Sequence, residues 1–242
     1  MKELLIKTYN DINKKNILSF IKKFLTRQQK KLIVTSNPEI YVSALKDEKI
    51  KEMLKDKNTL VIPDAVSVSY ALEKVLNKKV KAYPGVELLT DLLNLSNSMK
   101  KKVTVYIYGA TKEVNIKFKN FVNNNYKNII VVGNKDGYIK NVDRIKKDII
   151  DKKPDIIICA LGVPKQELFL YDILEKIEKG ILIGVGGSLD VLSGSIKRAP
   201  KIFRKLKIEW LYRIIRQPKR LKRFFKYNVK FIRLVRKCDK ND

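Results

Sequence analysis

The sequence of 242 residues contains no histidine and only two cysteines. The missing histidine excludes every mechanism that relies on an imidazole, as a general base or as a metal ligand. Cys159 and Cys238 make neither a disulfide framework nor a zinc site. An Asp-x-Asp pair, which often holds a divalent ion beside a diphosphate, is also absent. Any diphosphate would therefore have to be met by backbone dipoles and basic side chains.

Long apolar runs are missing too. No stretch reaches the roughly 18 apolar residues that a membrane span needs, and charges interrupt residues 1–31 every few positions, unlike a signal peptide. We therefore expect the protein to stay in the cytoplasm. Its length allows one sizeable α/β core with an appendage, or two small domains. We expect a core over residues 1–195 and an appendage over residues 196–242.

Acidic residues are few relative to basic ones. The formal net charge is +28, and residues 197–242 hold 18 of the 53 Lys and Arg residues but only 3 of the 25 acidic ones. More than half of the excess positive charge thus lies in under a fifth of the chain. This imbalance predicts a polyanionic partner, which can be nucleic acid, a nucleotide-sugar or an anionic membrane.

The most informative stretch is 155–170. Seven mostly apolar residues, too few for an ordinary helix, lead into Gly162, and Pro164 follows where a helix can begin. The pattern predicts a buried strand, a tight turn and a helix start, with Lys165, Gln166 and Glu167 at the mouth of a ligand site. The alternative is a surface turn whose polar residues only cap the helix.

Other parts of the chain repeat this plan of strand, turn and helix. Asp64 ends one such run, and its simplest alternative role is to cap the following helix. Asn37 likewise stands before Pro38 as a candidate cap. A glycine-rich turn at 184–187 would let a ligand approach the backbone closely, although such turns also occur for packing alone. The expected strands are 4–6, 32–35, 59–62, 103–108, 128–132, 155–161 and 180–184.

The strands alternate with segments long enough for helical crossovers. Such alternation predicts right-handed βαβ units and a mainly parallel α/β sheet flanked by helices. Because parallel strands end at the same edge, the Gly, Asn, Asp and Gln residues of the turns favour one shared ligand cleft there.

The appendage differs from the core in its sequence pattern. Apolar residues recur every three to four positions opposite a basic face, which describes a cationic amphipathic helix. Three interpretations remain open: a helix packed on its own core, a helix on a membrane surface, and an RNA-binding arm.

Several short motifs, each weak alone, are specific in their order and spacing. They are Thr35–Glu39, Pro63-Asp64, Pro84–Leu88, the Gly109 turn, Gly137-Tyr138, Leu161–Glu167, Gly184–Gly187, Gly194 with Arg198–Pro200, Glu209–Arg213 and Pro218–Arg220. Together they resemble the WecG/TagA/CpsF family of bacterial glycosyltransferases over nearly the whole chain.

The resemblance implies a Rossmann-like fold and an inverting transfer that needs no metal and no cofactor. The reaction moves a hexose, typically N-acetylmannosamine, from its UDP form to a polyprenyl-diphosphate-linked amino sugar. In Gram-positive bacteria this step makes the linkage disaccharide of wall teichoic acid. The implied partners are the UDP-sugar, the lipid-linked acceptor and the anionic inner face of the cell membrane. A homo-oligomer is possible, and nucleic acid is not expected.

The resemblance also implies residue roles. Asp64 falls on the general base, which takes the proton of the acceptor hydroxyl. Thr35, Asn37 and Gln166 fall on polar positions that orient the sugars. The nucleotide-binding candidates are Gly109, Tyr138, Gly186, Gly187 and Asp190.

In the family the appendage docks at the membrane and closes over the active site. Arg213, Arg220 and Arg223 are the matching candidates for contact with the diphosphate. The resemblance further implies that three aromatic side chains dip into the membrane interface. These are Phe224, Phe225 and Phe231.

The chain departs from the family pattern near the site. Ala65 replaces a glycine, Glu87 replaces an aspartate, and Ala82 stands where an arginine is common. The lost arginine points to a different sugar, a compensating Lys81 or weak activity. A nucleic-acid-binding module remains the alternative function, although it gives the polar strand-end residues no task.

Overall fold

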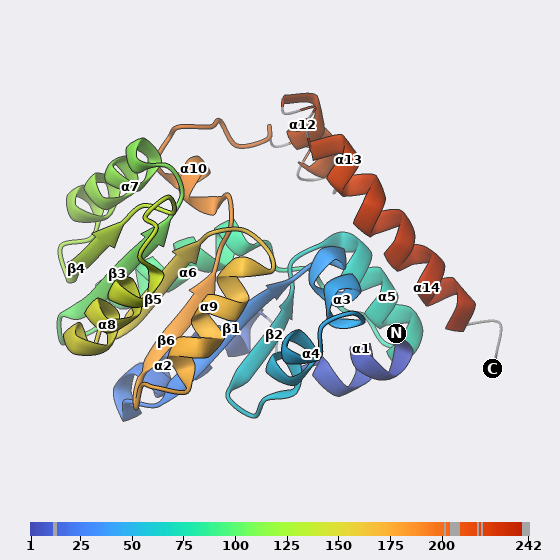
Figure 1. The fold of residues 1–242 in the computed structure, drawn as a ribbon, viewed down its shortest axis with the longest axis horizontal. Helices are drawn as coiled ribbons and strands as arrows, with labels where there is room; N and C mark the ends of the chain where they lie inside the picture. The colour runs from blue at the N-terminus through green and yellow to red at the C-terminus, as the bar shows by residue number, and fades with distance from the viewer. Residues whose placement is uncertain (12–13, 201, 204–208, 217, 219, 239–242) are drawn as a thin grey trace.

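Six parallel strands form one sheet in the order β2-β1-β6-β5-β3-β4 (Figure 1). The strands are β1 (Lys30–Ser36), β2 (Thr59–Pro63), β3 (Val103–Gly109), β4 (Ile129–Lys135), β5 (Ile156–Ala160) and β6 (Gly180–Gly184). The computed structural model describes residues 1–11, 14–200, 202–203, 209–216, 218 and 220–238. It describes no side chain for Lys14, Lys15, Arg213, Arg216, Arg220 and Cys238. The predicted parallel α/β sheet is confirmed.

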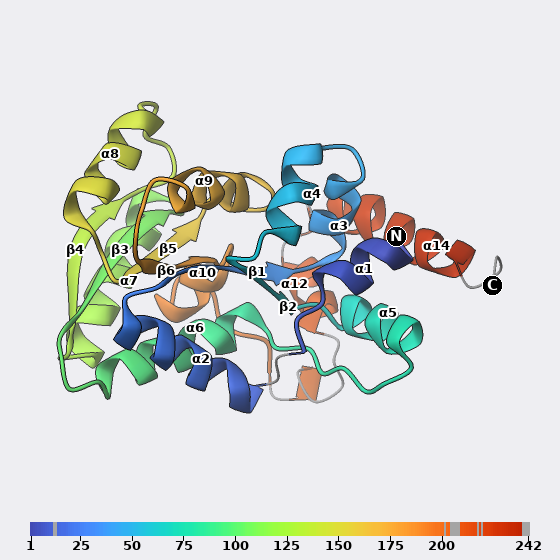
Figure 2. The ribbon, with the colours of Figure 1, turned by 90° about the horizontal axis from the view of Figure 1, so that it is seen from below.

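Helices cover both faces of the sheet, which gives three layers (Figure 2). One face carries α3 (Pro38–Ala44), α4 (Glu48–Lys55), α8 (Val142–Lys152) and α9 (Lys165–Leu174). The other carries α2 (Lys14–Arg27), α6 (Gly85–Asn97), α7 (Lys112–Asn125) and α10 (Ser188–Leu192). This double cover explains the nearly continuous apolar strands, since successive side chains of β5 enter opposite cores. Ile157 and Cys159 join the first core, and Ile156 and Ile158 join the second.

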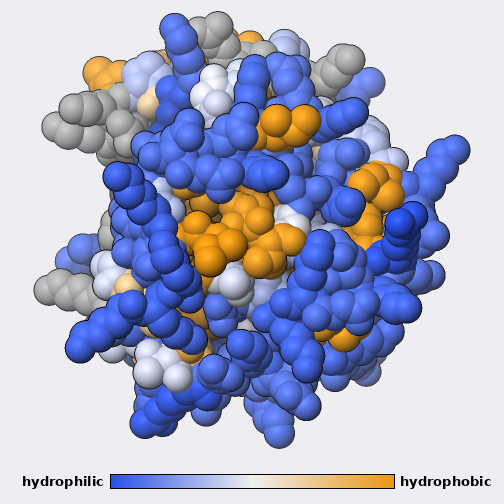
Figure 3. All heavy atoms as spheres, turned by 90° about the vertical axis from the view of Figure 1, so that its left-hand side faces the viewer, coloured by the Kyte–Doolittle hydropathy of each residue, from blue (hydrophilic) through white to orange (hydrophobic). Residues whose placement is uncertain are grey.

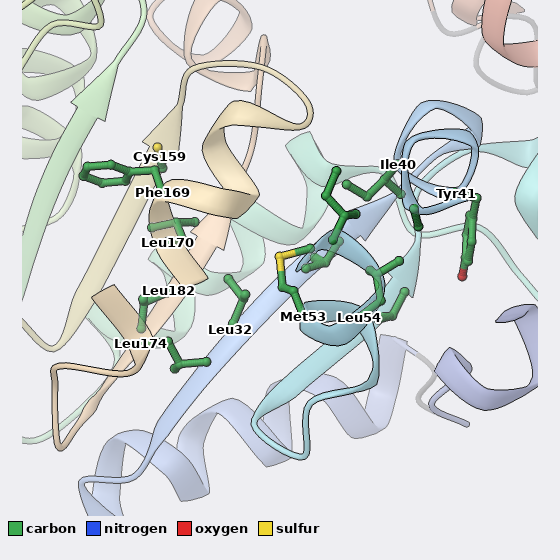
Figure 4. Packing of buried hydrophobic residues seen from close by; sticks show 14 of the residues in the cluster. Leu32, Ile40, Tyr41, Met53, Leu54, Cys159, Phe169, Leu170, Leu174 and Leu182 are labelled. Carbon is green, nitrogen blue, oxygen red and sulfur yellow. The ribbon is translucent and has the colours of Figure 1, made fainter. Parts of the chain in front are cut away.

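The first core joins the sheet to its helices. Figure 4 shows Leu170 and Leu174 of α9 beside Leu182 of β6 and Leu32 of β1. Met53 and Leu54 of α4 extend the same core toward β2. This packing fixes α9, and with it the turn after β5, against the centre of the sheet.

The two edges of the sheet differ. The β2 edge lies beside α5 (Val66–Leu76), which in turn packs against α1 (Lys2–Thr8). On the β4 edge Ile130 is 46% exposed. Figure 3 views this side and shows an apolar patch within a hydrophilic surface. The β4 edge is therefore the more open of the two.

The expected strand at 4–6 is wrong, because these residues belong to the helix α1. Leu4, Leu5 and Thr8 are buried at helical spacing, and the Thr8 hydroxyl donates to the carbonyl of Leu4 at 2.8 Å. A run of three apolar residues fits the periodicity of a strand and that of a helix equally well. Packing of these residues on the core therefore decided that they form a helix. The strand expected to end at residue 132 continues to Lys135.

The appendage contributes α12 (Glu209–Arg216), α13 (Arg220–Phe224), a π-helical turn η1 (Phe225–Val229) and α14 (Lys230–Cys238). The last three run as one rod past the β2 side (Figure 1). Phe231 is fully buried, with its ring 5.9 Å from that of Tyr41. The prediction that Phe231 enters a membrane interface is therefore wrong, because the protein's own core takes it. Over the described residues no helix combines the length and the apolarity that crossing a membrane requires.

Candidate active site

Asp64 lies directly after β2, at the carboxyl edge of the sheet. Its backbone N–H donates to the carbonyl of Ser36 at 3.0 Å, which ties the ends of β2 and β1 together. Its Oδ1 accepts the N–H of Gly85, the first residue of α6, at 2.6 Å. Asp64 does not cap α5, whose N-cap is Ala65 without a side-chain bond. The carboxylate is instead held at the positive end of a thirteen-residue helix.

Thr35 and Asn37 follow the same edge at the end of β1. Thr35 is buried, and its hydroxyl donates to the carbonyl of Gly184, the last residue of β6, at 2.9 Å. A methyl group built on Gly85 would lie 3.5 Å from the Thr35 methyl and 3.7 Å from Asp64 Oδ1. Thr35, Gly85 and Asp64 therefore form one wall. Asn37 caps α3 as predicted, because its Oδ1 accepts the N–H groups of residues 39 and 40.

Gln166 and Glu167 are buried in the first turn of α9. Both side chains are 1% exposed. Gln166 Oε1 accepts the N–H of Gly162 at 3.1 Å and that of Gly186 at 3.0 Å. Its Nε2 donates to Glu167 Oε1 at 2.7 Å. Gln166 therefore joins the turns that follow β5 and β6.

Glu167 carries an unusual carboxyl group. Burial raises the pKa of Glu167 to about 7, against the opposing effect of the hydrogen bond from Gln166. Glu39 raises this pKa further and Arg223 lowers it. The second oxygen, Oε2, is buried and has no hydrogen-bond partner among the described residues.

The ends of β3 and β4 are built from close backbone approaches. Gly109 has φ +118°, and a methyl group there would lie 2.5 Å from the backbone of Ala160. Asn115 of α7 joins the two strands, since its Nδ2 donates to the carbonyls of Gly109 and Lys135 at 2.9 Å each. Beyond them Tyr138 is 76% exposed. This half of the edge offers backbone and one open aromatic ring.

The remaining nucleotide candidates follow β6. Gly186 has φ +48°, Gly187 is the N-cap of α10, and Asp190 lies in the first turn of that helix. The N–H of Gly186 is already bonded to Gln166. Further along, Arg198 Nη2 lies 2.8 Å from Glu87 Oε1 in the first turn of α6. A guanidinium group is thus brought to the helix start that also holds Asp64.

The predicted residues fall into two groups along the edge. Asp64, Thr35 and Gln166 belong to the β2, β1, β6 and β5 ends, whereas Gly109 and Tyr138 belong to β3 and β4. With neighbouring strands about 4.8 Å apart, β2 and β3 are separated by roughly 19 Å. One compact ligand cannot touch both Asp64 at the end of β2 and Gly109 at the end of β3. An extended ligand lying across β6 and β5 can.

The appendage reaches the same edge through Arg223. Its Nε donates to Glu39 Oε2 at 2.8 Å, and its Nη2 donates to the carbonyl of Val163 at 3.0 Å. Glu39 follows β1 and Val163 follows β5. The side chains of Arg213 and Arg220 lie outside the described part of the chain, so these two predictions stay predictions.

Two side chains at this edge were not singled out from the sequence. Glu39 and Arg198 stand within recognised motifs, but a glutamate in a first helical turn reads as an ordinary partner of the helix dipole. Their pairing across the fold has no signature in the sequence. Glu167 was expected at the mouth of the ligand site, whereas the structure buries its side chain. Within the described ranges no cluster of three or more Cys, Asp or Glu side chains is arranged to hold a metal ion.

The fold and the site define a class: a parallel α/β protein in which the carboxyl edge of the sheet carries the fixed carboxylate of Asp64 beside glycine-containing turns. The chain belongs to the glycosyl transferase WecG/TagA/CpsF family, whose sequence model matches residues 3–241. The resemblance seen in the sequence is confirmed, and the protein is a member of a glycosyltransferase family.

Three similar proteins from other bacteria share the same enzyme name. The chain is 34% identical over 230 residues to an N-acetylglucosaminyldiphosphoundecaprenol N-acetyl-beta-D-mannosaminyltransferase of Bacillus subtilis, covering 93% of this chain and 88% of the relative. Relatives with the same name in Bacillus spizizenii and Staphylococcus aureus are 32% and 35% identical. The matched regions cover 83% and 84% of this chain, and 77% and 80% of the respective relatives.

Proposed function

We propose that this protein transfers N-acetylmannosamine, or a related hexose, from its UDP form to polyprenyl-diphosphate-linked N-acetylglucosamine. The product would be the linkage disaccharide of a teichoic-acid-type cell-wall polymer. The transfer inverts the anomeric centre and needs no metal ion. The names of the three relatives support the acceptor and the transferred sugar.

The observation that carries the proposal is the carboxylate of Asp64, held by the Gly85 N–H at the edge of the sheet. The acceptor hydroxyl attacks the anomeric carbon and gives its proton to Asp64. The new glycosidic C–O bond forms while the bond from that carbon to the UDP oxygen breaks. Attack opposite the leaving group inverts the configuration, and one base is sufficient for such a step.

The donor would lie across the β6 and β5 turns. Its sugar would lie beside Thr35 and Asn37, and Gln166 would orient the sugars through the turns that it joins. The capping role of Asn37 uses only its oxygen, which leaves its amide nitrogen to serve a hydroxyl group. The nucleotide would run past Gly186, Gly187 and Asp190, beside Gly109 to the ring of Tyr138.

Cations would stabilise the departing diphosphate. Arg213, Arg220 and Arg223 of the appendage are the candidates, and the contact of Arg223 with Glu39 supports the approach of this segment to the site. Arg198 adds a guanidinium on the α6 side, where Ala82 removes the family's arginine. We propose residues 1–195 as the catalytic unit and residues 196–242 as the segment that completes it.

The appendage would also hold the enzyme on the inner face of the cell membrane. Its exposed apolar residues stand among lysines and arginines, and each basic residue near an anionic surface contributes about 1 kcal/mol. Ile215 is 62% exposed and Phe225 is 54% exposed. The further exposed apolar side chains of the helices are Trp210, Leu211, Leu221 and Ile232. The homo-oligomer stays a prediction.

Turnover of a panel of UDP-sugars tests the reaction. Purified protein is incubated with EDTA, a short-chain analogue of polyprenyl-diphosphate-N-acetylglucosamine and each UDP-sugar, and UDP release is followed. We expect turnover with UDP-N-acetylmannosamine. Turnover with another UDP-hexose alone would keep the mechanism and change the donor. No turnover together with no binding of UDP would overturn the proposal.

Liposome binding tests the membrane site. We expect Ile215→Ser and Phe225→Ser each to weaken binding to anionic vesicles about tenfold, because an apolar side chain no longer enters the interface. Ile116→Ser on α7 is the matched control, since Ile116 is also exposed but lies outside the appendage. Unchanged binding in both variants would remove the membrane role. Retention on RNA at physiological salt would favour the nucleic-acid alternative.

A further inference from the structure

The amide of Gln166 is bonded at both ends inside the protein. Its oxygen accepts two backbone N–H groups, from Gly162 and Gly186, and its nitrogen donates to Glu167. An amide rotated by 180° would turn its NH2 group toward two donors and its oxygen toward a carboxyl group. The two backbone N–H groups and the Glu167 carboxyl therefore select the observed orientation together, and Glu167 is the only side chain among them.

We propose that Glu167 is a positioning residue that fixes the Gln166 amide and thereby holds the Gly162 and Gly186 turns in the shape that receives the donor. This inference goes beyond the proposed catalytic roles of Asp64 and the sugar-binding residues, and only its activity readout rests on the proposed function. Glu167 acts through Gln166, because its side chain is 1% exposed and cannot meet a ligand directly.

The space around Gln166 supports this role. A methyl group built on Gly184 would lie 2.8 Å from Gln166 Nε2, so glycine at 184 leaves room for the amide. The carbonyl of the same Gly184 accepts the Thr35 hydroxyl at 2.9 Å. Thr35 stands in the wall with Gly85 and Asp64. A chain of contacts therefore runs from Glu167 to the carboxylate that we propose as the base.

The charge of Glu167 adds a second, measurable property. Its Oε2 is buried without a hydrogen-bond partner among the described side chains, and burial raises the pKa of Glu167 to about 7. The groups that act on it are Glu39 from α3, Arg223 from α13 and the buried Cys159 thiol of β5. Near neutral pH the carboxyl changes protonation, and the strength of the bond from Gln166 changes with it.

Glycine amides report on these turns directly. The chain has only ten glycines, so protein labelled with 15N-glycine gives a spectrum in which Gly162 and Gly186 can be followed. In the native protein we expect both amide protons to exchange slowly with solvent, and both signals to shift with pH around a midpoint near 7.

Two variants separate positioning from packing. Glu167→Gln keeps the shape and an acceptor oxygen but cannot titrate, so slow exchange should persist while the pH-dependent shift disappears. Glu167→Leu removes the acceptor, so exchange at Gly162 and Gly186 should accelerate at least tenfold, with Gly133 unchanged. Glu175→Gln, on the exposed end of the same helix, is the control and should behave as the native protein.

Activity gives the functional readout. We expect Glu167→Leu to lower kcat/KM on the order of 100-fold, because a site displaced by about 1 Å costs that much. The loss should lie in KM for the UDP-sugar rather than in KM for the acceptor. Glu167→Gln should keep most of the native kcat/KM at pH 6.

The outcomes separate the two proposals. Unchanged glycine exchange in Glu167→Leu, or a pH-dependent shift that survives in Glu167→Gln, would overturn the positioning role even if the enzyme turns over UDP-sugars. If the Gly162 and Gly186 amides of the variants behave as expected but the native protein turns over no UDP-sugar, the positioning role is supported and the proposed reaction is overturned.

Discussion

The two halves of the sheet's carboxyl edge are built differently. At the ends of β2, β1 and β6, side chains make the connections: Asp64 bonds to the start of α6, and Thr35 bonds to Gly184. At the ends of β3 and β4, one buried side chain, Asn115, bonds to backbone carbonyls, Gly109 allows close backbone contact, and the prominent exposed side chain is Tyr138. The first half holds chemical groups in place, and the second leaves backbone and space.

This difference suggests a division of labour along an extended ligand. Reacting groups need fixed orientation, which buried hydrogen bonds supply. A nucleotide needs room and a stacking surface, which glycine turns and an open ring supply. Substitutions at Asp64 and Thr35 should therefore affect turnover, and those at Gly109 and Tyr138 should affect the fold or nucleotide affinity.

The largest effect is expected for Asp64→Asn. The amide cannot accept the proton of the acceptor hydroxyl, so kcat should fall about 10³-fold, or roughly 4 kcal/mol in activation free energy. UDP affinity, measured by calorimetry, should change little. Near-native turnover would remove Asp64 from the role of base.

Gly109→Ala should destabilise the protein by about 3 kcal/mol or more. The added methyl group would lie 2.5 Å from the Ala160 backbone, and φ is +118°. Gly194→Ala is the matched control: φ is +74°, but no atom of the described residues lies within 4 Å of the added methyl group, so a cost of about 1 kcal/mol is expected. Equal denaturant midpoints for the two variants would show that the close approach at Gly109 does not matter.

Glu167→Gln should change how stability depends on pH. Folding raises the pKa of Glu167 from 4.5 to about 7, so the folded state binds the proton more tightly. This contribution is fully present below pH 4.5 and is lost as the pH rises through 7. At about 1.4 kcal/mol per pKa unit the loss is roughly 3 kcal/mol.

Thermal melts check this dependence. The melting temperature of Glu167→Gln should rise relative to the native protein between pH 5 and pH 8, because the variant carries no buried charge. A constant difference across this range would contradict the raised pKa.

The smallest effect is expected for Tyr138→Ala. The ring is exposed, so the free energy of unfolding should change by less than about 0.5 kcal/mol. Loss of stacking on the base should weaken UDP binding about tenfold. Tyr70→Ala on α5, another exposed tyrosine, should leave UDP binding unchanged. Equal UDP affinities of the two variants would show that the nucleotide does not bind at the ends of β3 and β4.

Much of the fold could be predicted from the hydrophobic periodicity of the sequence and from its turn residues. Short apolar runs ending in Gly, Asn or Asp identified all six strands of the sheet, and Pro38 after Asn37 marked the start of α3. The failures share one cause, which is competition for burial. Leu4 and Leu5 fit a strand or a helix, and Phe231 fits a membrane or a core, until the surface that covers them is known.

The sequence by itself determined the strand ends and the residue types standing there, because hydrophobic period and turn chemistry are local properties of the chain. Only the tertiary structure decided which groups meet. Gly85, 21 residues beyond Asp64, donates to its carboxylate, and Arg223 reaches Glu39 across 184 residues. Such pairs depend on strand order and helix packing, which arise from burial of the whole chain and leave no signal at either residue.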